Sequence, residues 1–192
     1  MRHTLLASLV AASLLLAGCG NLAPATSNAT DATPPPNPGA ATDARIARDQ
    51  ARLKENPTSN SVSWDLAGAY LQKVREVGDP SYYGKADELL KAVLKRDPTH
   101  FEATVLTGQL MLARHDFRTA LDWGRKARAL NPYVTPPLAV IVDAEVELGR
   151  YPEAVDDVQK MVNLRPDLSS YSRVSYVREL NGDREGAIEA MK

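Results

Sequence analysis

Three prolines set 34 residues apart divide much of this 192-residue chain into equal units. They are Pro98, Pro132 and Pro166, and they end the similar phrases KAVLKRDP, KARALNP and MVNLRP. A fixed period of 34 residues is typical of a solenoid in which each unit is a helix–turn–helix pair. Because proline cannot continue a helix, each one is expected to end the second helix of its unit. The period therefore predicts an all-α stack of helical hairpins.

The clearest unit spans residues 101–132, where apolar and small residues recur at helical spacing. Small residues at three places would let two antiparallel helices approach closely. Counted from Phe101, positions 8, 17, 20, 27 and 32 hold Gly108, Phe117, Ala120, Ala127 and Pro132. This pattern resembles the tetratricopeptide repeat (TPR), which implies a right-handed superhelix and a role in protein–protein interaction.

Two neighbouring units follow the same phase less closely. The unit at 60–98 contains an insertion of about seven residues near 77–83, where Gly-Asp-Pro breaks the helix. In the unit at 135–166, Val142 stands at position 8 in place of the usual small residue. Together with 101–132, these units make up the body of the predicted solenoid, residues 43–192.

The two ends of the predicted solenoid are irregular. Residues 43–56 are predicted to form a capping helix with Asp43 as its N-cap and an apolar stripe that includes Ile46 and Leu53. A partial fourth unit, 169–192, stops in the middle of its second helix and would leave Ile188 and Met191 open. A terminal repeat normally has a polar outer face. We therefore expect either a fragment of a longer protein, which is the favoured interpretation, or an end covered by a second copy or a partner.

Residues 1–18 have the features of a bacterial signal peptide. Arg2 and His3 form a short basic lead, and residues 4–17 are uncharged and rich in Leu and Ala. This run is too short for a comfortable membrane span, which needs about 20 apolar residues. It ends in the sequence LAGC at 16–19, which resembles the lipobox of bacterial lipoproteins.

The resemblance implies that Cys19 is lipidated and becomes the first residue of the mature chain. Cys19 is the only cysteine, so an intramolecular disulfide is excluded. The alternative is an ordinary signal peptide with an incidental cysteine. Gly20 follows, rather than the Asp of an inner-membrane retention signal, so a Gram-negative cell would place the protein in the outer membrane, facing the periplasm. Residues 19–42, rich in Pro, Ala and Thr, are predicted to be a disordered tether that holds the folded part away from the bilayer.

The charge and the motifs exclude several functional classes. Removing residues 1–18 takes away one Arg, so the 22 remaining basic and 24 acidic residues give a net charge of −2, with no basic surplus for nucleic acid. No spacing of His and Cys predicts a metal site, and no Gly-rich loop predicts a phosphate site. His100 is interpreted as a solvent-facing turn residue, and His115 as part of an interhelix turn. No catalytic residue, cofactor, metal or small-molecule substrate is indicated.

The family resemblance implies that positions 2, 5, 9, 12 and 13 of the first helices line a groove for a partner helix or peptide. Asp143 and Glu147 lie four residues apart within this set and could hold basic partner segments, although a solvated face is the simpler interpretation. Trp64 is the best single anchor, with core packing against residues 46–53 as the alternative. The predicted groove residues are Trp64, Leu71, Gln72, Glu102, Val105, Gln109, Leu112, Asp143, Val146, Glu147, Arg173 and Val177.

The function implied is that of a non-catalytic scaffold or adaptor, held by lipid in the bacterial cell envelope, which brings envelope proteins or peptides together during assembly of an envelope machine. A competing interpretation makes the repeats the N-terminal accessory region of a longer envelope enzyme. A third is a structural homo-oligomer joined through the open C-terminal face.

Overall fold

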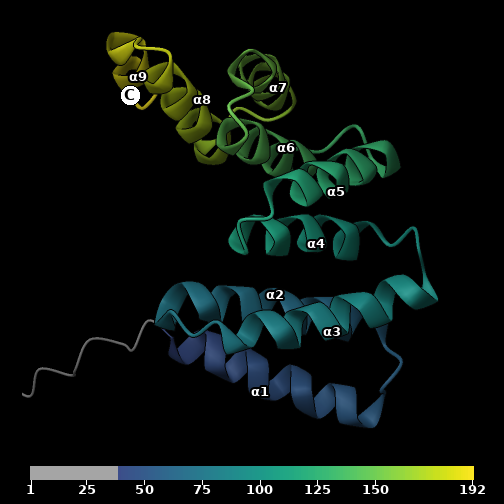
Figure 1. Ribbon diagram of the computed structural model, residues 1–192. Helices are drawn as coiled ribbons and strands as arrows, with labels where there is room; N and C mark the ends of the chain where they lie inside the picture. The colour runs from purple at the N-terminus through teal and green to yellow at the C-terminus, as the bar shows by residue number, and fades with distance from the viewer. Residues whose placement is uncertain (1–38) are drawn as a thin grey trace, which may run out of the picture. The chain divides into compact units, whose positions relative to one another are not determined.

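The computed structural model describes residues 39–192, and every regular element in that range is an α-helix (Figure 1). The predictions for the signal peptide, Cys19 and most of the tether lie outside the described residues. The helices are α1 (Ala40–Glu55), α2 (Asn60–Val77), α3 (Ser81–Arg96), α4 (Phe101–Ala113), α5 (Phe117–Leu130), α6 (Pro136–Glu147), α7 (Tyr151–Leu164), α8 (Leu168–Leu180) and α9 (Arg184–Glu189).

The helices stack as successive hairpins. Each helix contacts the next in the chain, and the first helices of successive hairpins also contact one another, α2 with α4, α4 with α6 and α6 with α8. The pairs α2–α3, α4–α5, α6–α7 and α8–α9 correspond to the units that the proline period predicts. The all-α fold of stacked helix–turn–helix units is therefore confirmed.

The turns inside the last three hairpins share one backbone geometry. Two residues beyond the end of the first helix lies a residue with positive φ, which is His115 (60°), Gly149 (71°) or Gly182 (81°). The N–H of the following residue then donates to a carbonyl five residues earlier, at 2.8–2.9 Å in each turn. This is a standard way to satisfy the free carbonyls at the end of a helix. The interpretation of His115 as a turn residue is confirmed.

Small residues bring the hairpins into close contact, as the pattern predicts. A Cβ added to Gly108 would lie 2.8 Å from Cγ1 of Val140, and one added to Gly124 would lie 2.9 Å from Cγ1 of Ile141. Both distances are shorter than a normal carbon–carbon contact of about 3.5–4.0 Å. Ala120 is completely buried in the cluster that contains Ile141. The crossing of α4 and α5 with α6 therefore depends on the missing or minimal side chains.

The start of α1 differs from the sequence prediction. Asp43 is not the N-cap, because the helix-forming Ala40 and Ala41 extend α1 back to Ala40, with Gly39 as the N-cap. Instead, the carboxylate of Asp43 lies 2.5 Å from Nζ of Lys73 on α2. The predicted break at residues 78–80 is present between α2 and α3. Most of the insertion near residues 77–83 lies within these two helices, which have 18 and 16 residues, against 13 and 14 for α4 and α5.

The two ends of the stack differ in how they are covered. At the first end, Ile46 is buried against α2 with Leu53 beside it, as the apolar stripe predicts. The Arg45 side chain adds an ion pair with Asp65 of α2. At the other end, Ile188 is 63% exposed and Met191 is 50% exposed, so the described part of the chain leaves this face open. None of the described helices combines the length and apolar character needed to cross a bilayer.

Candidate functional site

A cavity of about 280 Å³ lies among the first helices α4, α6 and α8, next to the turn between α4 and α5. Three valines provide its deepest surface: Val142 and Val146, four residues apart on α6, and Val177 on α8. All three belong to one buried cluster, whose packing restricts their side chains. The cavity therefore has a fixed apolar floor.

Aromatic and charged side chains surround this floor. Phe117 is half-buried at the start of α5, and Tyr176 of α8 is 49% exposed. The ring of His115 packs edge-on against that of Phe117, with 5.5 Å between their centroids. The remaining lining residues are Leu112, Asp143, Glu147 and Arg173.

An ion pair across two units fixes one side of the cavity. Nε of Arg173 on α8 donates to Oδ1 of Asp143 on α6, and Nη2 donates to Oδ2, both at 2.7 Å. Paired planar hydrogen bonds of this kind hold both side chains in one orientation. Nη1 of the same guanidinium donates to the carbonyl of Ser169, which fixes it further. Because Asp143 is engaged in this way, it is not available as a free acid.

Glu147 is the acidic group of the cavity that remains open. It is exposed one turn beyond Asp143, and within residues 39–192 it forms no ion pair. The arrangement can accommodate an apolar side chain on the valine floor, an aromatic contact beside Phe117 or Tyr176, and a positive charge near Glu147.

The structure places half of the predicted groove residues around this cavity and the other half elsewhere. Leu71 and Val105 are buried, and Gln109 is half-buried. Trp64 packs against the core cluster that includes Ile46, which is the alternative considered for it. The predicted residues that line the cavity are Leu112, Asp143, Val146, Glu147, Arg173 and Val177.

The other two predicted groove residues make short local contacts. Nε2 of Gln72 donates to Oε1 of Glu76 one turn along α2, at 3.0 Å. Oε2 of Glu102 lies 3.2 Å from Nδ1 of His100. Neither residue lines the cavity.

The sequence interpretation missed several lining residues. Val142 and Tyr176 both occupy position 8 of their units, where the repeat pattern has a small buried residue. A large side chain at that position in two successive units is the signal that could have identified them. His115 and Phe117 line the cavity because the turn between α4 and α5 lies beside α6.

The interpretation of His100 as solvent-facing is wrong. His100 is the N-cap of α4, and its Nδ1 accepts a hydrogen bond from the N–H of Ala103 at 3.4 Å. Its side chain is only 14% exposed. The ring therefore satisfies a free donor at the start of a helix, a structural role that Ser or Asp usually has. Among the described residues no cluster of His, Cys, Asp and Glu is arranged to hold a metal ion.

The ionisable residue Glu145 is buried outside the cavity. Glu145 of α6 is 2% exposed; its Oε2 has no hydrogen-bond partner among the described residues, and Oε1 lies 3.8 Å from Nη2 of Arg125. Burial first, and then the negative charge of Asp157, raise the pKa of Glu145 to about 7. Asp157 of α7, whose charge acts on Glu145, also lies 3.6 Å from Arg128 of α5.

The comparisons with known proteins agree with this fold. No protein-family model and no curated protein matches the chain. Among solved structures, TTC0263, a thermophilic TPR protein in Thermus thermophilus, is 18% identical with a TM-score of 0.69, over 78% of this chain and 79% of its own. MamA is 21% identical with a TM-score of 0.60, over 78% and 84%.

YrrB, described as a TPR protein with an unusual peptide-binding site, is 14% identical with a TM-score of 0.56, over 78% of this chain and 74% of its own. At identities this low, the likeness concerns architecture and carries no residue roles. It agrees with the hairpin stacking and the close crossings described above. The described part of this chain therefore has the stacked helix–turn–helix fold of TPR proteins.

Proposed function

We propose that the protein is a non-catalytic adaptor that binds a segment of a partner protein in the cavity among α4, α6 and α8. The observation that carries this proposal is an apolar floor of fixed shape bordered by an inter-unit ion pair and an open acid. Its support from outside the chain is the TPR fold, together with the peptide-binding site for which YrrB is described.

The cavity defines the chemistry of the segment. A Leu, Ile or Val side chain would cover Val142, Val146 and Val177, and full burial of such a side chain contributes about 1.5–3 kcal/mol. A Lys or Arg of the segment would lie near Glu147, at the edge of the cavity. Because Asp143 and Arg173 already hold each other, they need little reordering when the segment binds.

The binding prediction can be tested by photo-crosslinking in the producing bacterium. A photoreactive phenylalanine analogue at Tyr176 should give an adduct of discrete mass, because this half-exposed ring borders the cavity. Tyr133 is the matched control, since it is 83% exposed and does not line the cavity. Glu147→Lys should weaken the adduct at Tyr176. Equal crosslinking from both tyrosines, or none from Tyr176, would contradict the proposal.

The proposed setting is the bacterial cell envelope, with the chain anchored by lipid at Cys19. The support is the order of basic lead, apolar run and LAGC sequence in residues 1–19. Two or more acyl chains hold a protein firmly where one does not. The tether would let the TPR domain reach partners away from the bilayer surface, in the periplasm if the cell is Gram-negative. A role in assembling an envelope machine fits this position.

Cys19→Ser should move the protein from the membrane fraction to the soluble fraction. The reason is that the serine hydroxyl cannot receive the thioether-linked lipid, and no described helix is suited to spanning a bilayer. Fractionation of cells, followed by mass spectrometry of the N-terminal peptide, measures both location and acylation. Ser27→Ala is the control outside the lipobox. Persistent membrane association of Cys19→Ser after a high-salt wash would refute lipid anchoring.

A further inference from the structure

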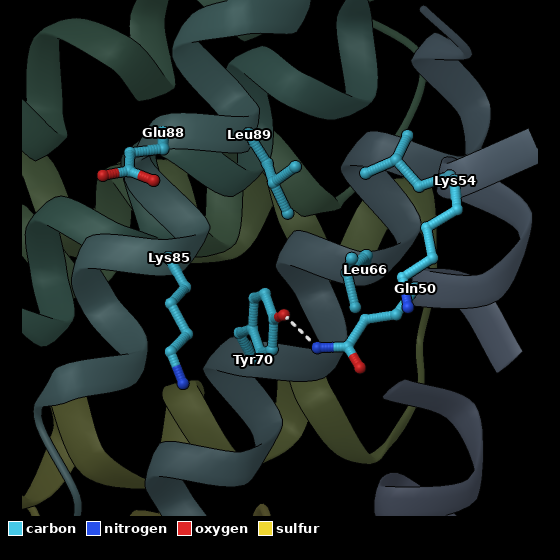
Figure 2. Close-up of a pocket in the computed structure, with 8 residues that line it drawn as sticks. Gln50, Lys54, Leu66, Tyr70, Lys85, Glu88 and Leu89 are labelled. Atoms are coloured by element: carbon cyan, nitrogen blue, oxygen red, sulfur yellow. Dashed lines mark hydrogen bonds between the residues drawn. The ribbon is translucent and has the colours of Figure 1, made fainter. Parts of the chain in front are cut away.

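Two hollows on another face of the stack lie at equivalent places one unit apart. The first, of about 570 Å³, is lined by α1, α2 and α3, and Figure 2 shows it in close-up. The second, of about 480 Å³, is lined by residues of α3, α4 and α5, with Arg114 at the end of α4. Tyr70 and Met111, both at position 11 of their units, line the two hollows. Helix α3 therefore forms a wall of both hollows.

The equivalent place in the third unit is filled. Glu145 stands at position 11 there and is buried. The ion pair of Arg128 with Asp157 spans the space between the second helices α5 and α7, and Arg125 lies beside Glu145. Such a pair has no counterpart in the described contacts between α1 and α3 or between α3 and α5. The two hollows described here both border α3.

The second hollow combines an apolar interior with a basic edge. Its apolar lining residues are Leu90, Leu94, Met111 and Trp123. The charged lining residues are Asp87, Lys91, Lys95 and Arg114, a net charge of +2 (three basic groups and one acid).

The single acid of this edge is already neutralised. Oδ2 of Asp87 lies 3.0 Å from Nζ of Lys91 and 3.1 Å from Nη1 of Arg114. These two cations hold the pKa of Asp87 below its usual value, against the effect of its burial. Nζ of Lys126 adds a further cation 4.6 Å from the centroid of the Trp123 ring.

The first hollow repeats this combination in a milder form. Leu53, Leu66 and Leu89 give it apolar surface, and the hydroxyl of Tyr70 accepts a hydrogen bond from Nε2 of Gln50 at 2.9 Å (Figure 2). Its charged lining residues are Lys54, Lys85 and Glu88, which leave one positive charge in excess.

We infer that α3 and its two hollows form a docking surface for an acidic, amphipathic segment of a partner protein. Charge complementarity favours this occupant, because both edges are basic although the chain as a whole has a net charge of −1. Apolar side chains of the segment would enter the hollows, and its Asp and Glu side chains would lie against Lys85, Lys91 and Lys95. The surface shares no lining residue with the cavity among α4, α6 and α8, so it is independent of the proposed groove.

The test uses the full chain in detergent and a defined fluorescent probe. The probe is a synthetic amphipathic peptide of about 15 residues with Leu and Phe at helical spacing and Glu elsewhere, and its matched partner carries Lys in place of Glu. Fluorescence anisotropy measures binding. The acidic peptide should bind, less tightly at high salt, and the basic peptide should bind at least about tenfold more weakly.

The double substitution Lys91→Glu with Lys95→Glu locates the site. Both residues are exposed, so the fold should be retained, and affinity for the acidic peptide should fall by about tenfold or more. The matched control, Lys160→Glu with Arg165→Glu, makes the same change in net charge on α7 and just beyond it and should leave the affinity within about twofold.

A Trp64→Phe background leaves Trp123 as the sole tryptophan, and its emission should shift when the acidic peptide binds. Any of four results would overturn the inference: no binding of the acidic peptide at about 0.1 mM, equal binding of the basic peptide, equal loss in the control variant, or an unchanged Trp123 spectrum. Vesicles of anionic phospholipid that bind the full chain and lose this binding with Lys91→Glu and Lys95→Glu, while the peptide does not bind, would assign the surface to a membrane instead.

Discussion

Glu145→Gln is expected to become more stable relative to the wild type as the pH rises. The difference in free energy of unfolding, variant minus wild type, should be about 2 to 3 kcal/mol larger at pH 8 than at pH 5. The pKa of Glu145 is raised from 4.5 to about 7 in the folded protein, because burial disfavours the charged carboxylate. The neutral amide has a similar shape and does not ionise. This single-atom exchange should therefore change the slope of stability against pH.

The direction of the effect follows from proton binding. Between pH 4.5 and 7 the folded state holds the Glu145 proton while the unfolded state has lost it. The contribution of Glu145 to stability is therefore full below pH 4.5 and is lost as the pH rises to about 7 and beyond. The charged groups that face it, Arg125, Asp157, Glu153 and Arg150, remain in the variant.

Urea unfolding followed by circular dichroism at several pH values between 5 and 8 measures this effect. Glu147→Gln is the matched control, because Glu147 is exposed on the same helix and its substitution should leave the slope unchanged. If the stability of the Glu145→Gln variant runs parallel to that of the wild type over this range, Glu145 is ionised in the folded protein. The account of its burial would then be wrong.

Ala120→Glu is expected to cost at least about 3 kcal/mol and to unfold the hairpin around it. Ala120 is completely buried against Leu121, Ile141 and Ala144. A glutamate there adds several heavy atoms to a closed helix crossing and buries a charge without a partner. The loss should appear as a lower urea midpoint and as rapid amide exchange in α5 and α6.

Ala129→Glu provides the control on the same helix. Ala129 is exposed near the end of α5, so the same substitution should change stability by no more than about 0.5 kcal/mol. The assignment of repeat positions would be wrong if Ala120→Glu left the stability unchanged, or if the two variants lost the same amount.

Local signals in the sequence predicted most of the fold. The prolines and the small residues make contacts only within one unit or between neighbouring units. These contacts therefore repeat every 34 residues, and the sequence period is enough to predict them. The start of α1 was misplaced because its N-cap is Gly39, which makes no side-chain capping bond, while Asp43 offered a false capping signal. Helix boundaries of this kind depend on weak local preferences.

The candidate site could be predicted only in part, for a different reason. Position within the repeat says which way a side chain points, but it does not say which neighbour covers it. The family pattern places Trp64 in the groove, yet the ring packs against the core cluster that includes Ile46 of α1. The pairing of Asp143 with Arg173 joins residues 30 positions apart, and it changes the role of Asp143 from a free acid to a structural one. Such long-range contacts require coordinates.

His115 has a left-handed backbone conformation, which affects which residues evolution would favour at this turn. The turns of the two following hairpins hold glycine at the corresponding place, Gly149 and Gly182, both with positive φ. A side chain in that conformation is less favourable than glycine by about 1 kcal/mol. His115 is the turn residue whose ring also borders the cavity, against Phe117. A variant selected only for thermal stability is expected to acquire glycine at this position and would then lose one side chain of the cavity lining.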